Sequence, residues 1–540
     1  MTSHEFKAKA ITLIDDLKAV CATYGLGNDG NEFKIITKVF LYKFLNDKFA
    51  HEVKQIEPSL AKAKSWEAVL AKKFADDYDM LLMQLGAGTA RLQPKHFLST
   101  LWGKQNDKNF AATLDATLLD IAALNTDIFS VMTNDGQKIV LFDPITQYVA
   151  TQRDAFAKAL INKLIPFSFE RIFAEKFDFY ATLFEYLIKD YNKDGGGKYA
   201  EYYTPHAVAK IMAACLVPAP VKNVTCYDPA AGSGTLLMNL AHAIGEDRCT
   251  LYAQDVSQKS SSLLRLNLIL NDLVHSIPNV IQGNTILEPF HKEEKGGGLR
   301  KFDFIVSNPP FKLDFSDFRD QLDTKTNQQR FFAGIPKITP LSKDKMAIYL
   351  LFVQHIIHSL TAKGRAAVVV PTGFITAQSG IEKGIREHLV KNKMLAGVVS
   401  MPSNIFATTG TNVSILFLDA TNTGDVVLID ASNLGTKVKE GKNQKTLLSH
   451  DDEQQIIRVF NGKEAIEDFS VVVSYDEIAA KNCSLSAGQY FDVKVEHVEI
   501  SEKQFDAAIR EKESAIESLF AESGELEKAI AKSLKSLRYE

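Results

Sequence analysis

The stretch Val224–Leu240, VTCYDPAAGSGTLLMNL, reads as a strand, a glycine-rich turn and the start of a helix. VTCYD is a short apolar run that ends on Asp228, and TLLMNL begins a helical apolar pattern. Gly232 and Gly234 allow positive φ angles and a close approach of the backbone to a ligand. A helix that begins directly after such a turn offers free N–H groups and the positive end of its dipole. The stretch therefore predicts a ligand-binding turn at the carboxyl end of a core strand.

The spacing within this turn argues against two common nucleotide-binding loops. A dinucleotide-binding turn reads GxGxxG, and a Walker A loop ends in Gly-Lys-Ser or Gly-Lys-Thr, whereas this turn reads DPAAGSG. We therefore expect that the ligand of this turn is neither a dinucleotide nor a nucleoside triphosphate.

Residues 167–492 alternate between strand-like and helical runs. TLYAQD, FDFIVSN, RAAVVVP, LAGVVSMP and VSILFLD are typical of buried strands, and GTLLMNLAHAI and AIYLLFVQHIIHSL are typical of covering helices. The alternation predicts an α/β domain with a parallel sheet covered on both faces. In such sheets ligands bind beyond the carboxyl ends of the strands.

Residues 1–166 predict a helical N-terminal domain. In EFKIITKVFLYKFLNDKFAHEV, apolar residues recur near one helix face with lysines opposite, and they are Phe33, Ile36, Val39, Phe40, Phe44 and Leu45. ATLLDIAALNTDIFSVM and DAFAKALINKLIPF show the same periodicity. We expect the residues of this domain to serve packing.

Residues 493–540 predict a C-terminal helical tail. One apolar stripe runs from Phe505 to Phe520 and a second from Leu526 to Leu537, with a break expected at Ser523-Gly524. The charged residues around the stripes have both signs, which favours contact with the helices of a partner over contact with DNA. A tail that folds back on its own domain is the alternative.

The composition limits the classes of function. A chain of 540 residues with a net charge of −4 and no basic run is expected to hold two or three domains and to bind DNA weakly by itself. The five cysteines lack CxxC spacing, which argues against a structural zinc site and a disulfide framework and favours a reducing cytoplasm. No apolar run approaches the roughly 18 residues of a membrane helix, and the charged start is not typical of a signal peptide.

Three further positions carry polar side chains suited to a ligand. Asp255 ends TLYAQD and can accept hydrogen bonds from both hydroxyls of a ribose, although DVSQ would also cap a helix. Asn284 follows another candidate strand and can bind the polar edge of a ring. Thr204-Pro205 is typical of a helix start, with Thr204 as N-cap and Pro205 as the first helical residue. A capping hydroxyl at that place also suits a ligand carboxylate.

VSNPPF, Val306–Phe311, ends the apolar run FDFIV with an amide, a stiff Pro-Pro corner and an aromatic ring. A strand-ending turn would by itself explain Asn before Pro. DPAAGSG followed by NPPF and preceded by YYTP, however, resembles S-adenosylmethionine-dependent DNA methyltransferases that act on adenine N6. The order of these motifs resembles the methylation subunit of type I restriction–modification systems. EFKIITKVFLYKFLNDKF, GRAAVVVPTGFI, MPSNIFATTGTNVSILFLD and LSAGQYFDV resemble other parts of that subunit, so the resemblance spans nearly the whole chain.

The resemblance implies a Rossmann-like methyltransferase domain that binds S-adenosylmethionine. Thr204 would meet the methionine carboxylate, and the turn Asp228–Gly234 would hold the methionine portion. Asp255 would bind the ribose, and Asn284 would meet the adenine of the cofactor. Asn284 stands where an Asp is usual, and Ala200 stands near where a Gly usually precedes the YTP block. The full set of implied cofactor residues is Tyr203, Thr204, Pro205, Asp228, Ala230, Gly232, Ser233, Gly234, Thr235, Asp255 and Asn284.

The resemblance also implies that Asn308, Pro309, Pro310 and Phe311 are the catalytic residues. The exocyclic amine of adenine is a poor nucleophile because its lone pair is conjugated with the ring. Acceptors on its two N–H bonds, the Asn308 side-chain carbonyl and the Pro309 backbone carbonyl, would favour a tetrahedral nitrogen. The Pro-Pro corner would preorganise both acceptors. Phe311 would stack on a base flipped out of the duplex.

The implied partners are a specificity (S) subunit, a second copy of the methylation (M) subunit, a restriction (R) subunit where the system has one, and duplex DNA in the cytoplasm. Three alternatives stay open. A protein glutamine N5 methyltransferase shares an NPPY-like strand end, but Phe311 and the large helical N-terminal domain disfavour it. An inactive cofactor-binding scaffold is disfavoured by the intact NPPF motif. A self-sufficient adenine-N6 methyltransferase is disfavoured by the acidic balance and by the lack of a second, recognition-like domain.

Overall fold

In the computed structural model, the described residues are 3–27, 30–170, 173, 204–293, 295, 297–338, 341–406, 412–440, 443–491 and 501–536. The chain forms two compact units, Met1–Tyr490 and Phe491–Glu540, and each is described by itself. Among the described residues, no helix combines the length and the apolar character that crossing a membrane requires.

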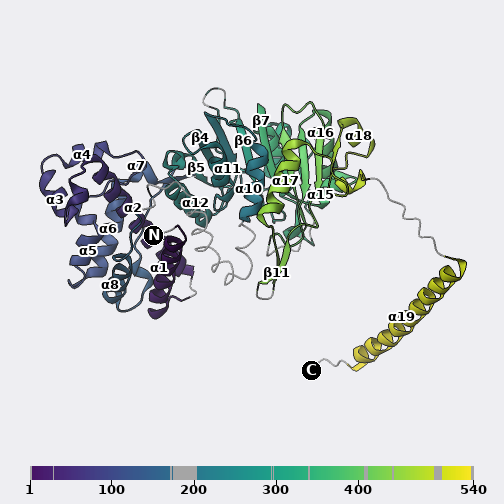
Figure 1. The fold of residues 1–540 in the computed structure, drawn as a ribbon, viewed down its shortest axis with the longest axis horizontal. Coiled ribbons are helices and arrows are strands. Elements are labelled where there is room, and N and C mark those ends of the chain that lie inside the picture. Colours follow the sequence, from purple (N-terminus) through teal and green to yellow (C-terminus); the bar gives the residue numbers. More distant parts are fainter. Residues whose placement is uncertain are drawn as a thin grey trace. The chain divides into compact units, whose positions relative to one another are not determined.

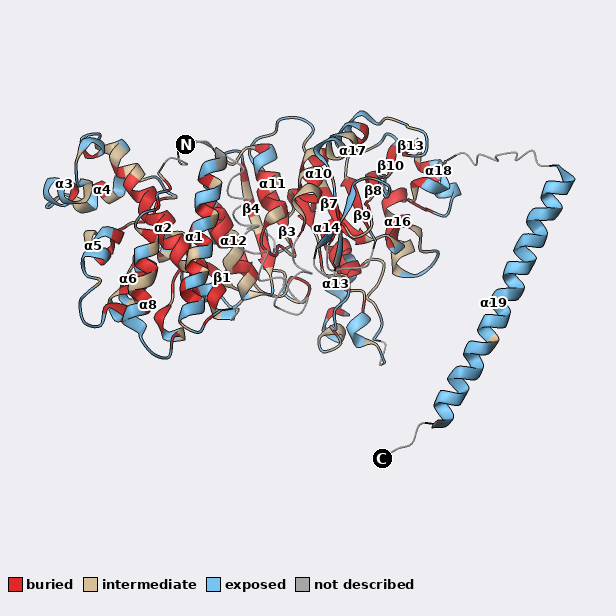
Figure 2. Ribbon diagram, turned by 60° about the horizontal axis from the view of Figure 1, so that its bottom comes forward, coloured by how far each residue is buried: buried red, intermediate tan, exposed pale blue. Residues whose placement is uncertain are grey.

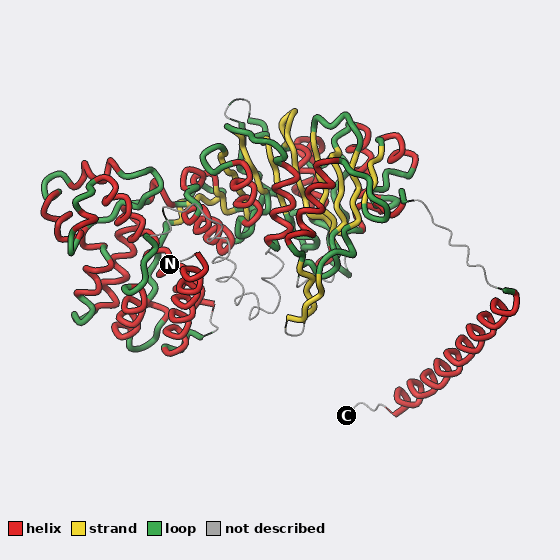
Figure 3. Tube along the Cα trace, viewed as in Figure 1, coloured by secondary structure: helices red, strands yellow, loops and turns green. Residues whose placement is uncertain are grey.

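The N-terminal part of the first unit is mainly helical (Figures 1 and 3). Its helices are α1 Ser3–Thr23, α2 Gly30–Ile56, α3 Trp66–Lys73, α4 Tyr78–Gln84, α5 Leu98–Gly103, α6 Phe110–Leu124, α7 Thr126–Phe129 and α8 Arg153–Leu164. Every residue of α2 from Val39 to Ala50 is buried, as the continuous red stretch in Figure 2 shows. The prediction of one apolar face with lysines opposite is therefore wrong for α2, because Lys43 and Lys48 are buried too.

A buried ion pair compensates the charge inside α2. Lys43 Nζ lies 2.9 Å from Asp47 Oδ1, and both side chains are nearly inaccessible. Asp47 also accepts hydrogen bonds from Asn46 Nδ2 at 3.1 Å and from the backbone N–H of Phe169 at 2.8 Å. Burial raises the pKa of the Asp47 carboxyl, while Lys43 and these donors lower it. The carboxylate thus ties the middle of α2 to the segment that follows α8.

In the part of the first unit that the structure describes, the centre is a sheet of eleven strands in the order β13-β10-β8-β9-β7-β6-β3-β4-β5-β1-β2. The strands are β1 Val131–Thr133, β2 Lys138–Ile139, β3 Val224–Asp228, β4 Cys249–Asp255, β5 Val280–Gln282, β6 Phe302–Ser307, β7 Leu360–Pro371, β8 Leu395–Ser400, β9 Val413–Asp419, β10 Val426–Asp430 and β13 Ser470–Val473. A separate hairpin pairs β11 Thr436–Glu440 with β12 Asn443–Leu447. The predicted α/β fold is confirmed, and the sheet is parallel in most but not all of its pairs.

Two details of the sheet differ from the prediction. β9 runs antiparallel to both of its neighbours, β7 and β8, and β13 and β2 are antiparallel at the two edges. β1 includes Val131 and Met132, which the sequence placed at the end of a helical run, and it pairs in parallel with β5. Apolar periodicity does not reveal strand direction, and a strand this short leaves too few residues to show alternation.

Helices cover both faces of this sheet. They are α10 His206–Leu216, α11 Thr235–Ile244, α12 Gln258–Leu270, α13 Lys325–Arg330, α14 Tyr349–His358, α15 Gly373–Thr376, α16 Gly380–Lys391, α17 His450–Gly462 and α18 Tyr475–Ala480. Figure 1 shows α12, α11, α10 and α17 in a row across one face, and α10 packs on both α11 and α17. The β6–α14–β7 crossover advances along the sheet in the opposite direction, and its right-handedness places α14 on the other face.

The second unit contains one long helix, α19 Glu502–Ser536. The predicted break at Ser523-Gly524 is wrong, because both residues lie inside this continuous helix. The large apolar side chains along α19 are all exposed, and they are Phe505, Ile509, Ile516, Leu519, Phe520, Leu526, Ile530 and Leu534. Leu537, the last residue of the predicted second stripe, lies outside the described residues.

The buried pair in α2 generates a stability prediction. Lys43→Met leaves Asp47 as an uncompensated buried carboxylate and should lower the free energy of unfolding by about 3–5 kcal/mol at pH 7. Lys383→Met removes the half-buried partner of exposed Glu387 on α16 and should cost less than about 1 kcal/mol. Denaturant unfolding of both variants measures the difference. The Lys43→Met loss should shrink as the pH falls, since a protonated Asp47 needs no cation, and equal losses in the two variants would contradict the prediction.

Candidate active site

The carboxyl ends of four parallel strands meet at one edge of the sheet. Asp228 ends β3, Asp255 ends β4, and the residues after β5 and β6 lie beside them because β3 pairs with β4 and β6, and β4 with β5. A pocket at this edge is lined by ten of the predicted site residues, namely Thr204, Asp228, Ala230, Gly232, Ser233, Thr235, Asp255, Asn284, Asn308 and Pro310. Pro205, Gly234, Pro309 and Phe311 do not line it, and Tyr203 and Ala200 lie outside the described residues.

The glycine-rich turn between β3 and α11 has the positive φ angles that its glycines permit. φ is +52° at Gly232 and +84° at Gly234. A Cβ added at Gly234 would lie 2.2 Å from Leu264 Cδ1 on α12, so a larger residue is excluded by space as well as by conformation. Asn267 of α12 donates from Nδ2 to the Ser233 carbonyl at 2.9 Å. The turn is therefore held from behind by α12, and its other side faces the pocket.

Asp255 connects the glycine turn to the start of α12. Its Oδ2 accepts from the Gly232 N–H and its Oδ1 from the Ser257 N–H, each at 2.8 Å. The N-cap of α12 is Ser257, whose hydroxyl accepts from the Ser260 N–H at 3.2 Å, so Asp255 is not the cap that the alternative reading required. The Ser260 hydroxyl also acts on this carboxylate and lowers its pKa, and a carboxylate with about four acceptor sites still has room for a ligand hydroxyl in the pocket.

Asp228 connects the turn to the next strand. Its Oδ1 accepts from the Ala230 N–H and from the Ser307 hydroxyl, each at 2.9 Å. Burial raises its pKa to about 7, with a further upward contribution from Asp255, while the two hydrogen bonds lower it. Burial raises the pKa of Asp255 as well. Two carboxylates whose charge is disfavoured by burial make this pocket suited to a cationic ligand.

Thr204 and Asn308 form a pair that the sequence did not predict. Helix α10 begins at His206 with Pro205 as its N-cap, so Thr204 stands one residue before the cap that it was predicted to be. Its hydroxyl instead accepts a hydrogen bond from Asn308 Nδ2 at 3.2 Å. This bond orients the amide so that Asn308 Oδ1 remains as an acceptor.

Asn284 uses its amide in the opposite way to Asn308, because its carbonyl and not its amino group is bound by the protein. Its Oδ1 accepts from the backbone N–H groups of Ile286 and Leu287, at 3.0 and 3.1 Å. The backbone thus uses the side-chain carbonyl of Asn284, and Nδ2 is the group that Asn284 has left for a ligand. Behind this loop, buried Arg330 donates to the carbonyls of Thr285 and Ile286, each at 2.7 Å.

The Pro-Pro corner holds its residues in different environments. Pro309 is buried, whereas Asn308 and Pro310 are half-buried and line the pocket. Phe311 is half-buried, and its ring meets that of Tyr349 nearly edge-on, with the centroids 6.2 Å apart. The sequence missed the apolar wall of the pocket, which includes Val256, Leu313, Ile348 and Phe352. Only Val256 had a usable signal, since it directly follows Asp255 at a strand end, and it is 67% exposed.

Residues 175–499 match the family model described as N-6 DNA Methylase.

The chain belongs to the N-6 DNA methylase family.

Two related proteins and one solved structure support the assignment to this family. The chain is 27% identical to the type I restriction enzyme MpnII methylase subunit of Mycoplasma pneumoniae, over 67% of this chain and 66% of that protein. It is 25% identical to the MjaIX methylase subunit of Methanocaldococcus jannaschii, over 70% of this chain and 67% of that protein. The crystal structure of a type I restriction-modification system methyltransferase subunit from Streptococcus thermophilus has the same fold, with a TM-score of 0.72 and 23% identity over 91% of this chain and 100% of that one.

The prediction of an adenine-specific DNA methyltransferase that uses S-adenosylmethionine is confirmed at the level of this family. The pocket of the methylase fits that cofactor. Its carboxylates suit a sulfonium, an ammonium and ribose hydroxyls, and Val256 offers an apolar contact for a purine.

Because the pKa of Asp228 is near neutrality, cofactor binding to the methylase should depend on pH. The raised pKa means that Asp228 is largely protonated below about pH 7 and ionised above it. Between pH 6 and 8 the ionised fraction of a carboxyl with a pKa of about 7 rises from about one tenth to about nine tenths. The affinity for S-adenosylmethionine should therefore rise by roughly tenfold. Titration calorimetry at several pH values measures it. S-adenosylhomocysteine, which lacks the sulfonium charge, and Asp228→Asn should both show a flatter profile, and a flat profile for S-adenosylmethionine itself would refute the role of Asp228.

Proposed function

We propose that the chain is the methylation subunit of a type I restriction–modification complex and methylates N6 of adenine in duplex DNA. The observation that supports this most is the Asn308–Thr204 hydrogen bond, which leaves the Asn308 carbonyl as an acceptor beside the carboxylates of the cofactor pocket. Bound S-adenosylmethionine supplies the electrophilic methyl group. The residues of this chain then have to bind the cofactor, orient the adenine amine and exclude water.

The cofactor roles follow from the groups that remain free to bind. The turn at Gly232–Ser233 and the carboxylate of Asp228 would surround the methionine portion, and the unused lone pairs of Asp255 would accept from the ribose. Asn284 would donate from Nδ2 to a ring nitrogen of the adenine, since its carbonyl is held by the backbone. This differs from the role that an Asp would have at position 284, because an Asp accepts and cannot donate when ionised.

The target amine would be held by two acceptors. Asn308 Oδ1 would accept one N–H bond and the Pro309 carbonyl the other, which favours a tetrahedral nitrogen with its lone pair free to attack. Pro309 is buried and Pro310 has a fixed φ, so neither acceptor must be reorganised during the reaction. A strong general base is unnecessary, because the amine proton becomes acidic only after the methyl group is transferred. Phe311, which is half-buried and meets Tyr349 nearly edge-on, would stack on the flipped base.

The partners would be a specificity subunit, a second methylation subunit, a restriction subunit where the system has one, and duplex DNA, which places the chain in the cytoplasm. The relatives described above are named as methylase subunits of type I restriction enzymes. The net charge of −4 supports the view that another subunit supplies many of the phosphate contacts. The exposed apolar stripe of α19 is the best candidate for a helical docking element, because such a surface is unfavourable in water.

The acceptor role of Asn308 can be separated from cofactor binding. Asn308→Ala removes one acceptor and should nearly abolish methyl transfer, while the Kd for S-adenosylmethionine changes by no more than a few-fold. Asn308→Asp keeps an acceptor, although it loses the donor to Thr204, and should retain more activity than Asn308→Ala. Transfer of the labelled methyl group to DNA in the assembled complex measures both. Wild-type turnover by Asn308→Ala would refute the acceptor role.

The docking role of α19 can be tested with two charge-neutral double variants. Leu519→Lys with Leu526→Glu disrupts the apolar stripe and should prevent assembly with the specificity subunit. Glu511→Lys with Lys528→Glu changes the opposite, charged face by the same number of substitutions and should leave assembly intact. Size-exclusion chromatography of each variant mixed with that subunit distinguishes them. Normal assembly of the stripe variant would show that α19 is not the docking element.

A further inference from the structure

A hairpin from the N-terminal part of the chain extends the sheet beside the cofactor pocket. β1 and β2 pair antiparallel and are joined by residues 134–137, where Gly136 has a φ of +81°. The Asn134 N–H donates to the Gln282 carbonyl at 3.1 Å, which continues the parallel pairing of β1 with β5. The hairpin turn therefore places Asn134 next to Gly283, the first residue after β5.

The side chain of Asn134 fills the space beside Gly283. A Cβ added at Gly283 would overlap the amide group of Asn134. The Gly283 N–H also donates to the Asp255 carbonyl at 2.8 Å, so the backbone here joins the ends of β4 and β5. A glycine at this position thus lets Asn134 approach the two strand ends that carry Asp255 and Asn284.

The hydrogen bonds of Gln254 show which way the Asn134 amide is turned. The Phe290 N–H can only donate, and it donates to Gln254 Oε1 at 3.1 Å. Gln254 Nε2 is then the group that faces Asn134, and it donates to Asn134 Oδ1 at 3.1 Å. Asn134 Nδ2 in turn donates to Glu288, whose backbone carbonyl and Oε2 both lie at 3.2 Å. The amide thus joins β4 to the loop after β5.

Both partners of Asn134 adjoin residues that line the cofactor pocket. Gln254 is fully buried and directly precedes Asp255 at the end of β4. The Glu288 N–H donates to the Asn284 backbone carbonyl at 2.8 Å, which closes the loop between these two residues. A shift of either partner would therefore move Asp255 or Asn284, the residues that would bind the ribose and the adenine.

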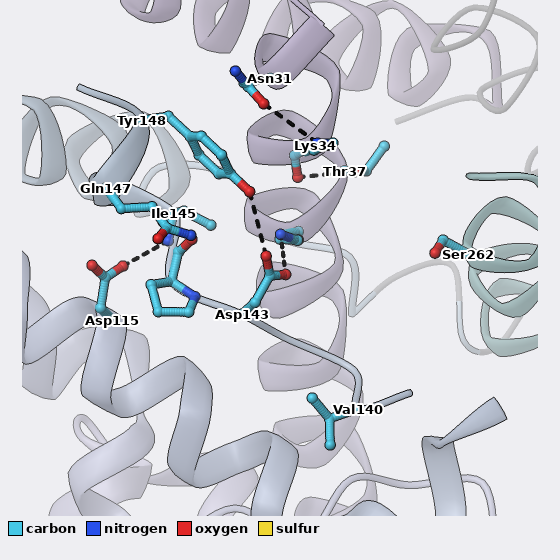
Figure 4. A network of polar contacts seen from close by, with 12 residues as sticks. Asn31, Lys34, Thr37, Asp115, Val140, Asp143, Ile145, Gln147, Tyr148 and Ser262 are labelled. Atoms are coloured by element: carbon cyan, nitrogen blue, oxygen red, sulfur yellow. Dashed lines mark hydrogen bonds and ion pairs between the residues drawn. The ribbon is translucent and has the colours of Figure 1, made fainter. Parts of the chain in front are cut away.

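The hairpin is anchored on its other side, so its position is fixed. Arg265 of α12 donates to the carbonyls of Ile139 and Val140, at 2.9 and 3.0 Å, where β2 ends. Figure 4 shows the next anchor, where Asp115 of α6 accepts from the Ile145 N–H at 2.8 Å. A side chain on a fixed backbone can hold its partners in one geometry.

We propose that Asn134 is a positioning residue for the adenosine half of S-adenosylmethionine. Asn134 does not line the pocket and acts through its two partners on Asp255 and Asn284. The inference rests on the cofactor roles proposed above for those two residues. It gives the N-terminal part of the chain a role in the site, whereas the sequence predicted that residues 1–166 serve packing.

The test compares two ligands by titration calorimetry on the full chain. They are S-adenosylmethionine and 5′-methylthioadenosine, which keeps the adenosine half and lacks the amino acid. Asn134→Ala should weaken both by the same factor, roughly fivefold or more, because it removes hydrogen bonds that hold both strand ends. Asp228→Asn, at the methionine end, should weaken S-adenosylmethionine alone. Asn162→Ala removes the hydrogen bond from Trp102 in the same part of the chain and should change neither affinity by more than about twofold.

A second variant tests the contact between Asn134 and Gly283. Gly283→Ala places a Cβ where the Asn134 amide lies, so it should weaken both ligands as Asn134→Ala does. Combined with Asn134→Ala it should cost little more, because the amide that it would displace is already gone. Additive losses would show that the two residues act separately and would contradict the inference.

Three other outcomes would overturn the inference. Unchanged binding by Asn134→Ala, while Asp255→Ala loses affinity, would remove the role of Asn134 and leave the proposed cofactor roles standing. Unchanged binding by Asp255→Ala would overturn the proposed ribose contact and this inference with it. A loss in Asn134→Ala that is confined to S-adenosylmethionine would place the effect at the methionine end of the pocket.

Discussion

The hydrogen bond from the Ser307 hydroxyl to Asp228 holds the two halves of the active site together. Asp228 ends β3 and begins the glycine-rich turn, whereas Ser307 ends β6 and begins the Pro-Pro corner. Because these strands are neighbours in the sheet, this one bond sets the position of the cofactor turn relative to Asn308. Burying the carboxylate is unfavourable, as its raised pKa shows, and the bond to Ser307 partly offsets that cost.

A chain of buried hydrogen bonds supports the loop after β5, which carries Asn284. Tyr227 meets His355 Nε2 at 3.2 Å, and Arg330 donates to His355 Nδ1 at 3.0 Å, so the imidazole is neutral and donates from Nε2. Arg330 also holds the carbonyls of Thr285 and Ile286. Burial lowers the pKa of Arg330 to about 10, and these acceptors take the place of a carboxylate partner. The loop that presents Asn284 is therefore fixed from behind, with its side-chain carbonyl turned to its own backbone.

The sequence predicted the strand ends well and the contacts between them poorly. Asp228, Asp255 and Asn308 could be found because each follows an apolar strand, and strand ends share one edge in a parallel sheet. The Thr204–Asn308 bond joins residues far apart in the chain, so no local pattern contains it. Whether Asn284 offers a ligand its carbonyl or its amino group depends on two backbone N–H groups that only the folded loop presents. Local patterns thus give the identity of a side chain, while its partners are set by tertiary structure.

Charge shows the same distinction on a larger scale. The sequence contains no basic run, yet the fold brings five cations together at one cavity between α2 and α12, namely Lys34, Lys38, Lys138, Lys259 and Arg265. These cations do not reverse the expectation of weak DNA binding by the isolated chain. Arg265 is directed to backbone carbonyls and Lys38 to Asp143, so two of the five cations are held by the protein itself. Affinity for duplex DNA needs cations spaced along an exposed surface to neutralise successive phosphates, and cations gathered at one cavity do not supply that spacing.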